Sequence, residues 1–295
     1  MDQGFLSARF DADAGPETQT DSALVPWWSF TKTALATAAL QLVGQGHFRL
    51  DERIGGRAFT LRQLLQHRAG VPDYGALVSY HEAIRRGEKP WEISELLDRV
   101  GAYHLDFDPG HGWRYSNVGY LFVRQLIEDA VGRDIGNALR YLVLDDLGLD
   151  SVRIATSPED LADTAWGNRI EYDPGWVYHG LLIGTPGDAV RFLHGLMSGD
   201  VLPQKLLAEM RTCHSISERS LPGRPWETTG YGLGLMIGRM VSAGIAMGHS
   251  GVGPGSVSAI YHFGDRPTPC TVAAFGTGDH EGTTEYEVVR LAQLR

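Results

Sequence analysis

The sequence Ser29-Phe30-Thr31-Lys32 opens an Ala-rich apolar stretch that continues to Val43. We expect a buried helix over residues 29–43, ended by Gly44 and Gly46. Residues three positions apart share one face of a helix, with Cβ atoms about 5–6 Å apart. The hydroxyl of Ser29 and the amine of Lys32 can therefore meet at the start of this helix.

The place of Lys32 in the first turn of a helix favours its use as a base. Burial and the positive end of the helix dipole both disfavour the ammonium form and so lower the lysine pKa. Ser29 could then pass its proton to Lys32, while backbone N–H groups at the helix start, including that of Ser29, could bind an oxyanion. The motif alone leaves a plainer interpretation open, in which Lys32 is exposed and Ser29 only caps the helix.

A second polar element, Tyr115-Ser116-Asn117, stands directly before an amphipathic pattern that begins at Val118. Side chains at the end of a rigid helix are readily aimed into a cleft. A phenol becomes a competent base or proton shuttle beside a cation such as Lys32, and Asn117 can bridge that lysine and a substrate carbonyl. Taken alone, Asn117 is typical of a helix cap.

His249-Ser250-Gly251 is the third element, and Val252-Gly253-Pro254-Gly255 follows it between two expected strands. Glycine lets a strand edge approach a ligand closely. Taken alone, the histidine is typical of a structural residue and the Gly-rich turn of a hairpin. The order and spacing of the three elements along the chain favour a functional site over these structural interpretations.

Strand patterns lie near both ends of the chain, and helical patterns lie between them. We expect strands over residues 4–10, 230–237, 244–248, 257–263 and 271–276, and helices over 188–197 and 285–294. Residues 60 to about 178 show mainly helical periodicity. These patterns predict an α/β fold, in which a sheet completed by both termini is joined to a mainly helical insertion.

S-x-x-K at 29–32, Y-x-N at 115–117 and H-x-G at 249–251 resemble the three signatures of serine β-lactamase-like and penicillin-binding-protein-like proteins. The resemblance is to the branch of class C β-lactamases, D,D-peptidases and esterases. Flanking phrases extend it over nearly the whole chain from about Leu24. These phrases are Thr60 to His67 with Gly70-Val71-Pro72, Asp108-Pro109-Gly110, Gly180 to Phe192, Tyr231 to Gly234 and Gly248 to Gly255.

The resemblance implies a serine β-lactamase/D,D-peptidase-like fold, with an antiparallel sheet flanked by helices and a mainly helical domain. We expect residues 1–58 and 182–295 to form the sheet domain and residues 59–181 to form the inserted helical domain. The active site would lie between the two. Ser29 follows only 28 residues, fewer than usual in this family, so the N-terminal part of the sheet is expected to be shortened, or the native chain begins further upstream.

The resemblance also implies residue roles. Ser29 would be the nucleophile, Lys32 its hydrogen-bonded activator and Tyr115 the shuttle that brings a proton to the leaving group. Substrate binding would involve Asn117, His249, Ser250, Gly251 and Val252, with the backbone N–H groups of Ser29 and Val252 as oxyanion hole. An apolar acyl pocket would draw on aromatic residues, although such residues are as often ordinary core: Trp27, Trp28, Tyr74, Trp113, Tyr178 and His179. No metal and no cofactor is implied.

His249 occupies the position where β-lactamases of this branch usually carry lysine. An imidazole is largely neutral at pH 7 and attracts a substrate carboxylate less strongly. We therefore expect hydrolysis of a small ester or amide through an acyl-enzyme, of carboxylesterase or D-amino-acid peptidase/amidase type. A β-lactamase, or a penicillin-binding sensor with slow deacylation, is the alternative.

A more remote alternative takes Gly248-His249-Ser250-Gly251 as the nucleophile elbow of an α/β-hydrolase, with Ser250 as nucleophile. The fifth position of that motif is Val252 and not glycine, and a Gly/Pro turn follows where the elbow needs a helix. Asp265 or Asp279 with His280 would have to complete such a triad. That interpretation gives no catalytic role to Ser29, Lys32 and Tyr115.

Composition and net charge limit the classes of partner that the chain can bind. The chain has 295 residues, 43% of them hydrophobic, and a formal net charge of -10, so a large core is expected and nucleic acid is a poor partner. No apolar stretch is long enough for a membrane span, and no signal peptide is visible, which favours a cytoplasmic location if the chain does not begin upstream. Partners are then small-molecule esters, amides or peptides. An oligomer is possible but cannot be inferred.

Overall fold

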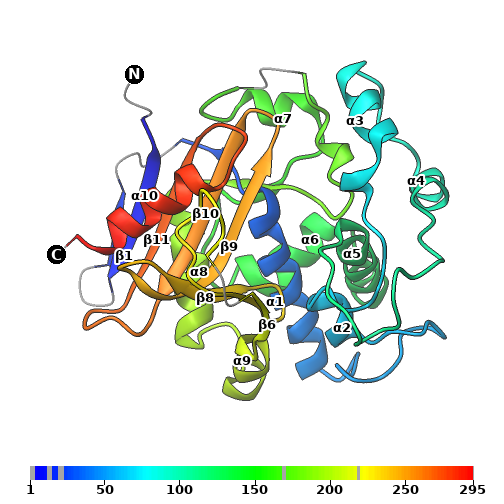
Figure 1. Cartoon of the computed structure of the whole chain (residues 1–295), viewed down its shortest axis with the longest axis horizontal. Coiled ribbons are helices and arrows are strands. Elements are labelled where there is room, and N and C mark those ends of the chain that lie inside the picture. The colour runs from blue at the N-terminus through cyan, green and yellow to red at the C-terminus, as the bar shows by residue number, and fades with distance from the viewer. Residues whose placement is uncertain (1–3, 12–14, 19–22, 168–170, 218–219, 295) are drawn as a thin grey trace.

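An eight-stranded antiparallel sheet forms one layer of the molecule, in the order β2-β1-β11-β10-β9-β8-β7-β6 (Figure 1). The computed structural model describes residues 4–11, 15–18, 23–167, 171–217 and 220–294. The strands are β1 (Leu6–Asp11), β2 (Gly15–Thr18), β6 (His214–Ser217), β7 (Thr229–Tyr231), β8 (Met236–Met240), β9 (Gly244–Gly253), β10 (Ser256–Phe263) and β11 (Cys270–Thr277). The N-terminal strands and the C-terminal strands thus share one sheet.

The middle strands are apolar on both faces because both faces are covered by helices. Along β10, Ile260 joins the core that holds helices α1 (Thr31–Gly44) and α8 (Pro186–Ser198), whereas Ala259 and Tyr261 join a second core under helix α10 (Gly282–Ala292). Alternate residues of a strand point to opposite faces, so the two cores lie on opposite sides of the sheet. Figure 1 shows α10 crossing the sheet on the near side.

Helix α1 lies in the middle of the larger core. Its alanines allow close packing against α5 (Asn117–Val131), and a Cβ on Gly234, in the turn between β7 and β8, would come within 2.4 Å of Ala36 Cβ. Lys32, in the first turn, has no exposed surface. The expected buried helix is therefore confirmed, and a lysine at its start is buried with it.

The segment between the sheet strands folds into short helices. These are α2 (Leu61–Leu65), η2 (Tyr74–Ala76), α3 (Val78–Arg85), α4 (Ile93–Val100), α5, α6 (Ile135–Leu139), η3 (Arg140–Leu144), α7 (Pro158–Ala162) and η4 (Pro174–Trp176), and α9 (Gln204–Arg211) follows α8. A small sheet, β3 (Val25–Pro26), β5 (Leu182–Gly184) and β4 (Arg153–Ile154), joins this region to the start of α1. The division into two domains stays a prediction.

The expected strands and closing helix are present with shifted ends. The single strand expected over 244–248 continues to Gly253, and the strand expected over 230–237 is instead two strands, β7 and β8, with a turn between them. At the edge expected to be shortened, β1 pairs with β11 and β2 pairs with β1. Among the described residues, no helix is both long and apolar enough to cross a membrane.

Candidate active site

Ser29 lies in the helical turn η1 (Trp28–Phe30), between strand β3 and helix α1. Trp28, immediately before it, has a positive φ of 47°, a conformation that costs energy for a residue with a side chain. The Trp28 ring is held by a 2.9 Å hydrogen bond from Nε1 to Ser256 Oγ on β10. This bend turns the backbone from the small sheet into α1 and presents Ser29 at the junction.

Strand β9 passes close to Ser29 because two of its residues are glycines. A Cβ on Gly251 would lie 2.6 Å from the Ser29 backbone nitrogen, and a Cβ on Gly253 would lie 2.2 Å from the Trp28 ring. β9 pairs with β8 only as far as Gly248, so its edge from His249 onward is open toward Ser29. The expected close approach of a Gly-rich strand edge is present.

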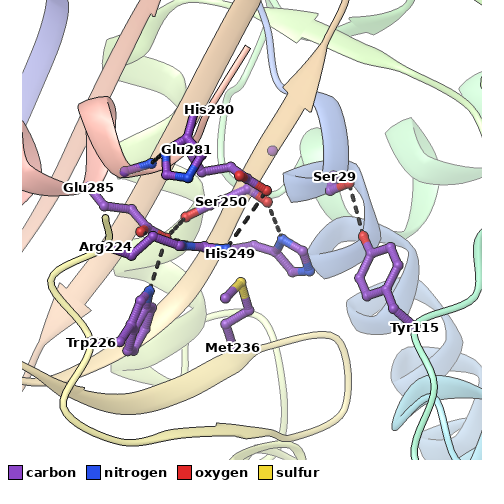
Figure 2. Close-up of polar contacts among 12 residues, drawn as sticks. Ser29, Tyr115, Arg224, Trp226, Met236, His249, Ser250, His280, Glu281 and Glu285 are labelled. Atoms are coloured by element: carbon purple, nitrogen blue, oxygen red, sulfur yellow. Dashed lines mark hydrogen bonds and ion pairs between the residues drawn. The ribbon is translucent and has the colours of Figure 1, made fainter. Parts of the chain in front are cut away.

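Ser29 Oγ contacts the two predicted catalytic partners. The Tyr115 hydroxyl donates to Ser29 Oγ at 2.9 Å (Figure 2), and Lys32 Nζ lies 3.3 Å from the same oxygen. Lys32 Nζ also lies 5.0 Å from the centroid of the Tyr115 ring. The structure therefore brings the hydroxyl, the amine and the phenol together.

Burial makes Lys32 a base near neutral pH. It lowers the lysine pKa to about 7, against the opposing pull of the Asp73 carboxylate. Two further partners hold the amine, Asn117 Oδ1 at 2.8 Å and His179 Nε2 at 3.0 Å. A neutral amine has two N–H groups for these two acceptors, which leaves its lone pair for the Ser29 hydroxyl.

Tyr115 remains a neutral phenol. Burial raises its pKa well above the usual value, and the hydrogen bond to Ser29 opposes this only in part. A phenol that keeps its proton is a donor and not a base. Of the two groups on Ser29 Oγ, Lys32 is therefore the one able to take a proton.

Asp73 orients Asn117. Its partly buried carboxylate accepts the Asn117 backbone N–H at 2.7 Å and lies 3.4 Å from Nδ2, which turns Oδ1 of the amide toward Lys32. Burial raises the pKa of Asp73. Sequence reasoning missed this residue, although it follows the Gly70-Val71-Pro72 phrase directly.

His67 fixes the segment that carries Tyr115. Its Nδ1 accepts the Ser116 backbone N–H at 3.0 Å, while the Ser116 hydroxyl donates to the Pro72 carbonyl and accepts the Gly119 amide. Ser116, and not Asn117, is the N-cap of α5. Asn117 is therefore free to use its side chain at Lys32.

His249 is buried and neutral. Its Nδ1 lies 2.5 Å from the Ser250 carbonyl and must carry the proton, so Nε2 accepts from the Tyr231 hydroxyl at 2.8 Å. Burial, with the nearby Lys32 charge, lowers its pKa to about 3. His249 therefore brings no positive charge to the position where β-lactamases of this branch usually carry lysine.

Ser250 is turned away from the nucleophile. Its hydroxyl lies 2.6 Å from the Tyr261 hydroxyl and 2.5 Å from Glu285, and both partners are buried. Ser250 still lines the cleft, so its substrate-binding role stays a prediction. The α/β-hydrolase alternative is wrong, since Ser250 lies within a strand and its hydroxyl bonds no histidine among the described residues. Gly251 lies against Ser29, and Val252 is 42% exposed.

A cleft of about 870 Å³ opens at Ser29. Most of the expected residues line it: Trp28, Ser29, Tyr74, Trp113, Tyr115, Asn117, His179, His249, Ser250 and Val252. Trp27 and Tyr178 belong to the core instead, because Trp27 packs against Phe192 and the Tyr178 hydroxyl donates to the Trp91 carbonyl. Within the described ranges, no group of three or more His, Cys, Asp or Glu side chains is arranged to hold a metal ion.

The comparisons with known proteins agree with this architecture. The chain is 26% identical over 251 residues to penicillin-binding protein 4* of Bacillus subtilis, covering 77% of this chain and 53% of that protein. It is 29% identical over 206 residues to esterase EstB of Burkholderia gladioli, covering 62% of this chain and 52% of that protein. The chain thus spans about half the length of these two curated relatives.

Solved structures match over almost the whole chain. The D-amino acid amidase of Ochrobactrum anthropi SV3 superposes with a TM-score of 0.82 at 25% identity, covering 98% of this chain and 95% of that one. A D-stereospecific amidohydrolase from Streptomyces sp. gives a TM-score of 0.76 at 25% identity, with 98% and 93% covered. The Beta-lactamase family model matches residues 5–294, and the chain therefore belongs to the Beta-lactamase family.

Proposed function

We propose that this chain is a serine hydrolase that forms an acyl-enzyme on Ser29 and hydrolyses small esters or amides, of carboxylesterase or D-amino-acid amidase/peptidase type. The observation that carries the proposal is the convergence on Ser29 Oγ of the Lys32 amine at 3.3 Å and the Tyr115 phenol at 2.9 Å, at a cleft. A nucleophile within reach of a base, which other groups orient in turn, is the arrangement that acyl transfer needs.

In the proposed acylation, the free amine of Lys32 takes the Ser29 proton as Oγ attacks the acyl carbon. The negative charge then forms on the carbonyl oxygen, where the backbone N–H groups of Ser29 and Val252 would hold it. Tyr115 gives its proton to the departing amine or alkoxide, and the Lys32 ammonium replaces it. The carbon–leaving-group bond breaks and the acyl group stays on Ser29.

Deacylation repeats these steps with water as the nucleophile. Lys32 takes a proton from the attacking water, Tyr115 gives its proton to the departing Ser29 Oγ, and the Lys32 ammonium replaces the Tyr115 proton as the acid is released. Asn117 and His179 keep the amine in place through both halves of the reaction, since each accepts a hydrogen bond from it. Both halves use Lys32 in its neutral form, and its pKa of about 7 fits that use.

The type of substrate rests on the relatives and on the charge at His249. One relative is named an esterase and two structural neighbours a D-amino acid amidase and a D-stereospecific amidohydrolase. The β-lactamase alternative is less favoured, because a neutral His249 gives a penicillin carboxylate no cation to bind. We therefore expect D-amino acid amides and short esters to be better substrates than penicillins.

Steady-state kinetics on a small panel tests this proposal. The panel is 4-nitrophenyl butyrate, D-phenylalanine amide, L-phenylalanine amide and benzylpenicillin, with Ser29→Ala as the inactive control and Ser250→Ala as the matched serine variant. We expect turnover of the ester or the D-amide by the native chain and none by Ser29→Ala. Penicillin hydrolysis faster than both would favour the β-lactamase alternative, and full activity in Ser29→Ala would refute the proposal.

A further inference from the structure

The open edge of β9 has two ends that meet different parts of the site. At one end, Gly251 and Gly253 lie against the Ser29 amide and the Trp28 ring. At the other end, the His249 ring lies 6.3 Å from the Tyr115 ring, centroid to centroid. Tyr115 is the proton donor to the leaving group in the proposed function. The leaving group therefore occupies the end of the cleft beside His249.

A group of three charged residues borders this end, on the side of β9 opposite Tyr115 (Figure 2). Glu285 is completely buried, accepts from Ser250 and from Trp226 Nε1, and forms a two-pronged ion pair with Arg224 that includes a 2.7 Å contact from Nε. Arg224 Nη1 lies 3.8 Å from Glu281 Oε1. The guanidinium is thus committed mainly to the buried carboxylate.

Arg224 and Glu281 both line the cleft, and Glu281 is the one carboxylate of this group that does so. The Glu281 side chain is 25% exposed, and its contact with Arg224 is longer than a hydrogen bond. One guanidinium faces two carboxylates, so the group carries a net negative charge. The Glu281 charge also contributes to the raised pKa of Tyr115, which places the phenol within its electrostatic reach.

Arg224 is already counted in this net charge, and the other nearby cations do not offset it. His249 is neutral at pH 7, and Lys32 is half neutral there and lies on the far side of Ser29. Arg85 also lines the cleft, but from helix α3 on the helical wall, where its side chain is exposed and screened by solvent. Asp279, two residues before Glu281, adds a further carboxylate to the cleft lining.

We propose that Glu281 is a specificity residue, which favours acyl donors whose leaving group is neutral or cationic and disfavours leaving groups that carry a carboxylate. Primary amides, simple esters and amine-bearing leaving groups fit this rule. Penicillins and peptides that end in a free carboxylate do not, because their carboxylate would lie beside Glu281. The inference rests on the proposed function, since it takes Tyr115 as donor to the leaving group.

Three esters that share the same acyl group test the role of Glu281 directly. They are the butyrate esters of 3-hydroxybenzamide, 3-hydroxybenzoate and (3-hydroxyphenyl)trimethylammonium, which place a neutral, an anionic and a cationic substituent on the leaving phenol. The value of kcat/KM is measured for each at pH 8, for the native chain and for Glu281→Gln. We expect the ratio of anionic to neutral ester to rise about 5- to 10-fold in Glu281→Gln, and the ratio of cationic to neutral ester to fall.

Two controls make the result specific. Glu227→Gln removes an equal charge from an exposed side chain outside the cleft and should leave both ratios unchanged. The fraction of each protein labelled to completion by a fluorophosphonate reports an intact site. In 1 M NaCl the native ratios should move toward those of Glu281→Gln.

The outcomes separate the two proposals. Hydrolysis of all three esters with ratios that Glu281→Gln does not change would overturn the role of Glu281 and leave the proposed function standing. Equal shifts in Glu281→Gln and Glu227→Gln would also overturn it, because they would show a general effect of net charge. No hydrolysis of any ester by the native chain would overturn both.

Discussion

Nζ of Lys32 lies 3.0 Å from Nε2 of His179, although 147 positions separate the two residues along the chain. The pKa of His179 is held well below its usual value by burial and by the Lys32 charge, so the imidazole is neutral. A neutral imidazole can accept a hydrogen bond from the amine at Nε2 while Nδ1 carries the ring proton. His179 is thus a positioning residue for the base.

Replacing His179 should disturb the base and not the nucleophile. In His179→Leu the Lys32 ammonium loses an acceptor, so we expect kcat to fall roughly 10- to 100-fold. The acidic limb of the pH profile should also move to lower pH, since the ammonium is stabilised less. His179→Gln, whose Oε1 can accept, should recover part of both. Equal loss in the two variants, with no movement of the pH profile, would assign His179 a purely structural role.

Activity should follow the titration of Lys32. Because the neutral amine is the base and its pKa is about 7, kcat/KM should rise with pH through about 7 and approach a plateau by about pH 9. At pH 5 it should be about 100-fold below that plateau. A profile measured with 4-nitrophenyl butyrate checks this. A rise centred near pH 10 would contradict a base with a lowered pKa.

The same titration should appear in stability. The Lys32 pKa is lower in the folded chain than its unfolded value of 10.5, so the unfolded chain binds more protons above pH 7 and stability increases with pH. Between pH 6 and pH 9 this single group adds about 3 kcal/mol. Lys32→Met should lose that increment, so the difference in stability between variant and native chain should change by this amount between the two pH values in urea unfolding. A constant difference would contradict the assignment.

Tyr115→Phe should separate amides from activated esters. Without the phenol, an amine leaving group has no proton donor, so hydrolysis of the D-amide should fall by about 10²- to 10³-fold. 4-Nitrophenolate leaves without protonation, and the ester rate should fall less. The control is Tyr103→Phe, at a tyrosine that is 63% exposed. Equal losses for ester and amide would show that Tyr115 is not the proton donor to the leaving group.

Gly251→Ala tests the approach of β9 to the nucleophile. The new Cβ would lie 2.6 Å from both the Ser29 nitrogen and Trp28 Cβ, closer than real contacts allow. We expect at least a 100-fold loss of kcat/KM, or a lower unfolding temperature, because β9 or η1 must move. At Gly4 a Cβ would meet no heavy atom within 4 Å, so Gly4→Ala should behave as the native chain.

The sequence predicted the parts of the site that follow from local spacing and motif order. Ser29 and Lys32 meet because three residues make one helical turn, and Tyr115 and Asn117 lie on the end of a helix whose pattern was visible. Asp73 was missed, and His179 was expected only as a residue of the acyl pocket, without its contact to Lys32. They lie in loops, 44 and 147 positions from their partners, and no periodicity connects such positions.

Local backbone geometry also determines which side chains reach the cleft, and the sequence does not predict this geometry. Trp27 and Trp28 are adjacent and chemically identical, yet only Trp28 lines the cleft. The positive φ at Trp28 turns the chain at this point, and nothing in the composition of the segment signals it. In the same way Ser250 looked available in the motif, but a buried glutamate 35 positions away engages its hydroxyl.

Peptide mapping of the acylated protein tests the central claim most directly. After reaction with a fluorophosphonate, the mass increase of one adduct should be found on the peptide that contains Ser29, and the Ser29→Ala variant should carry none. An adduct on the peptide that contains Ser250, or one that persists in Ser29→Ala, would contradict the account.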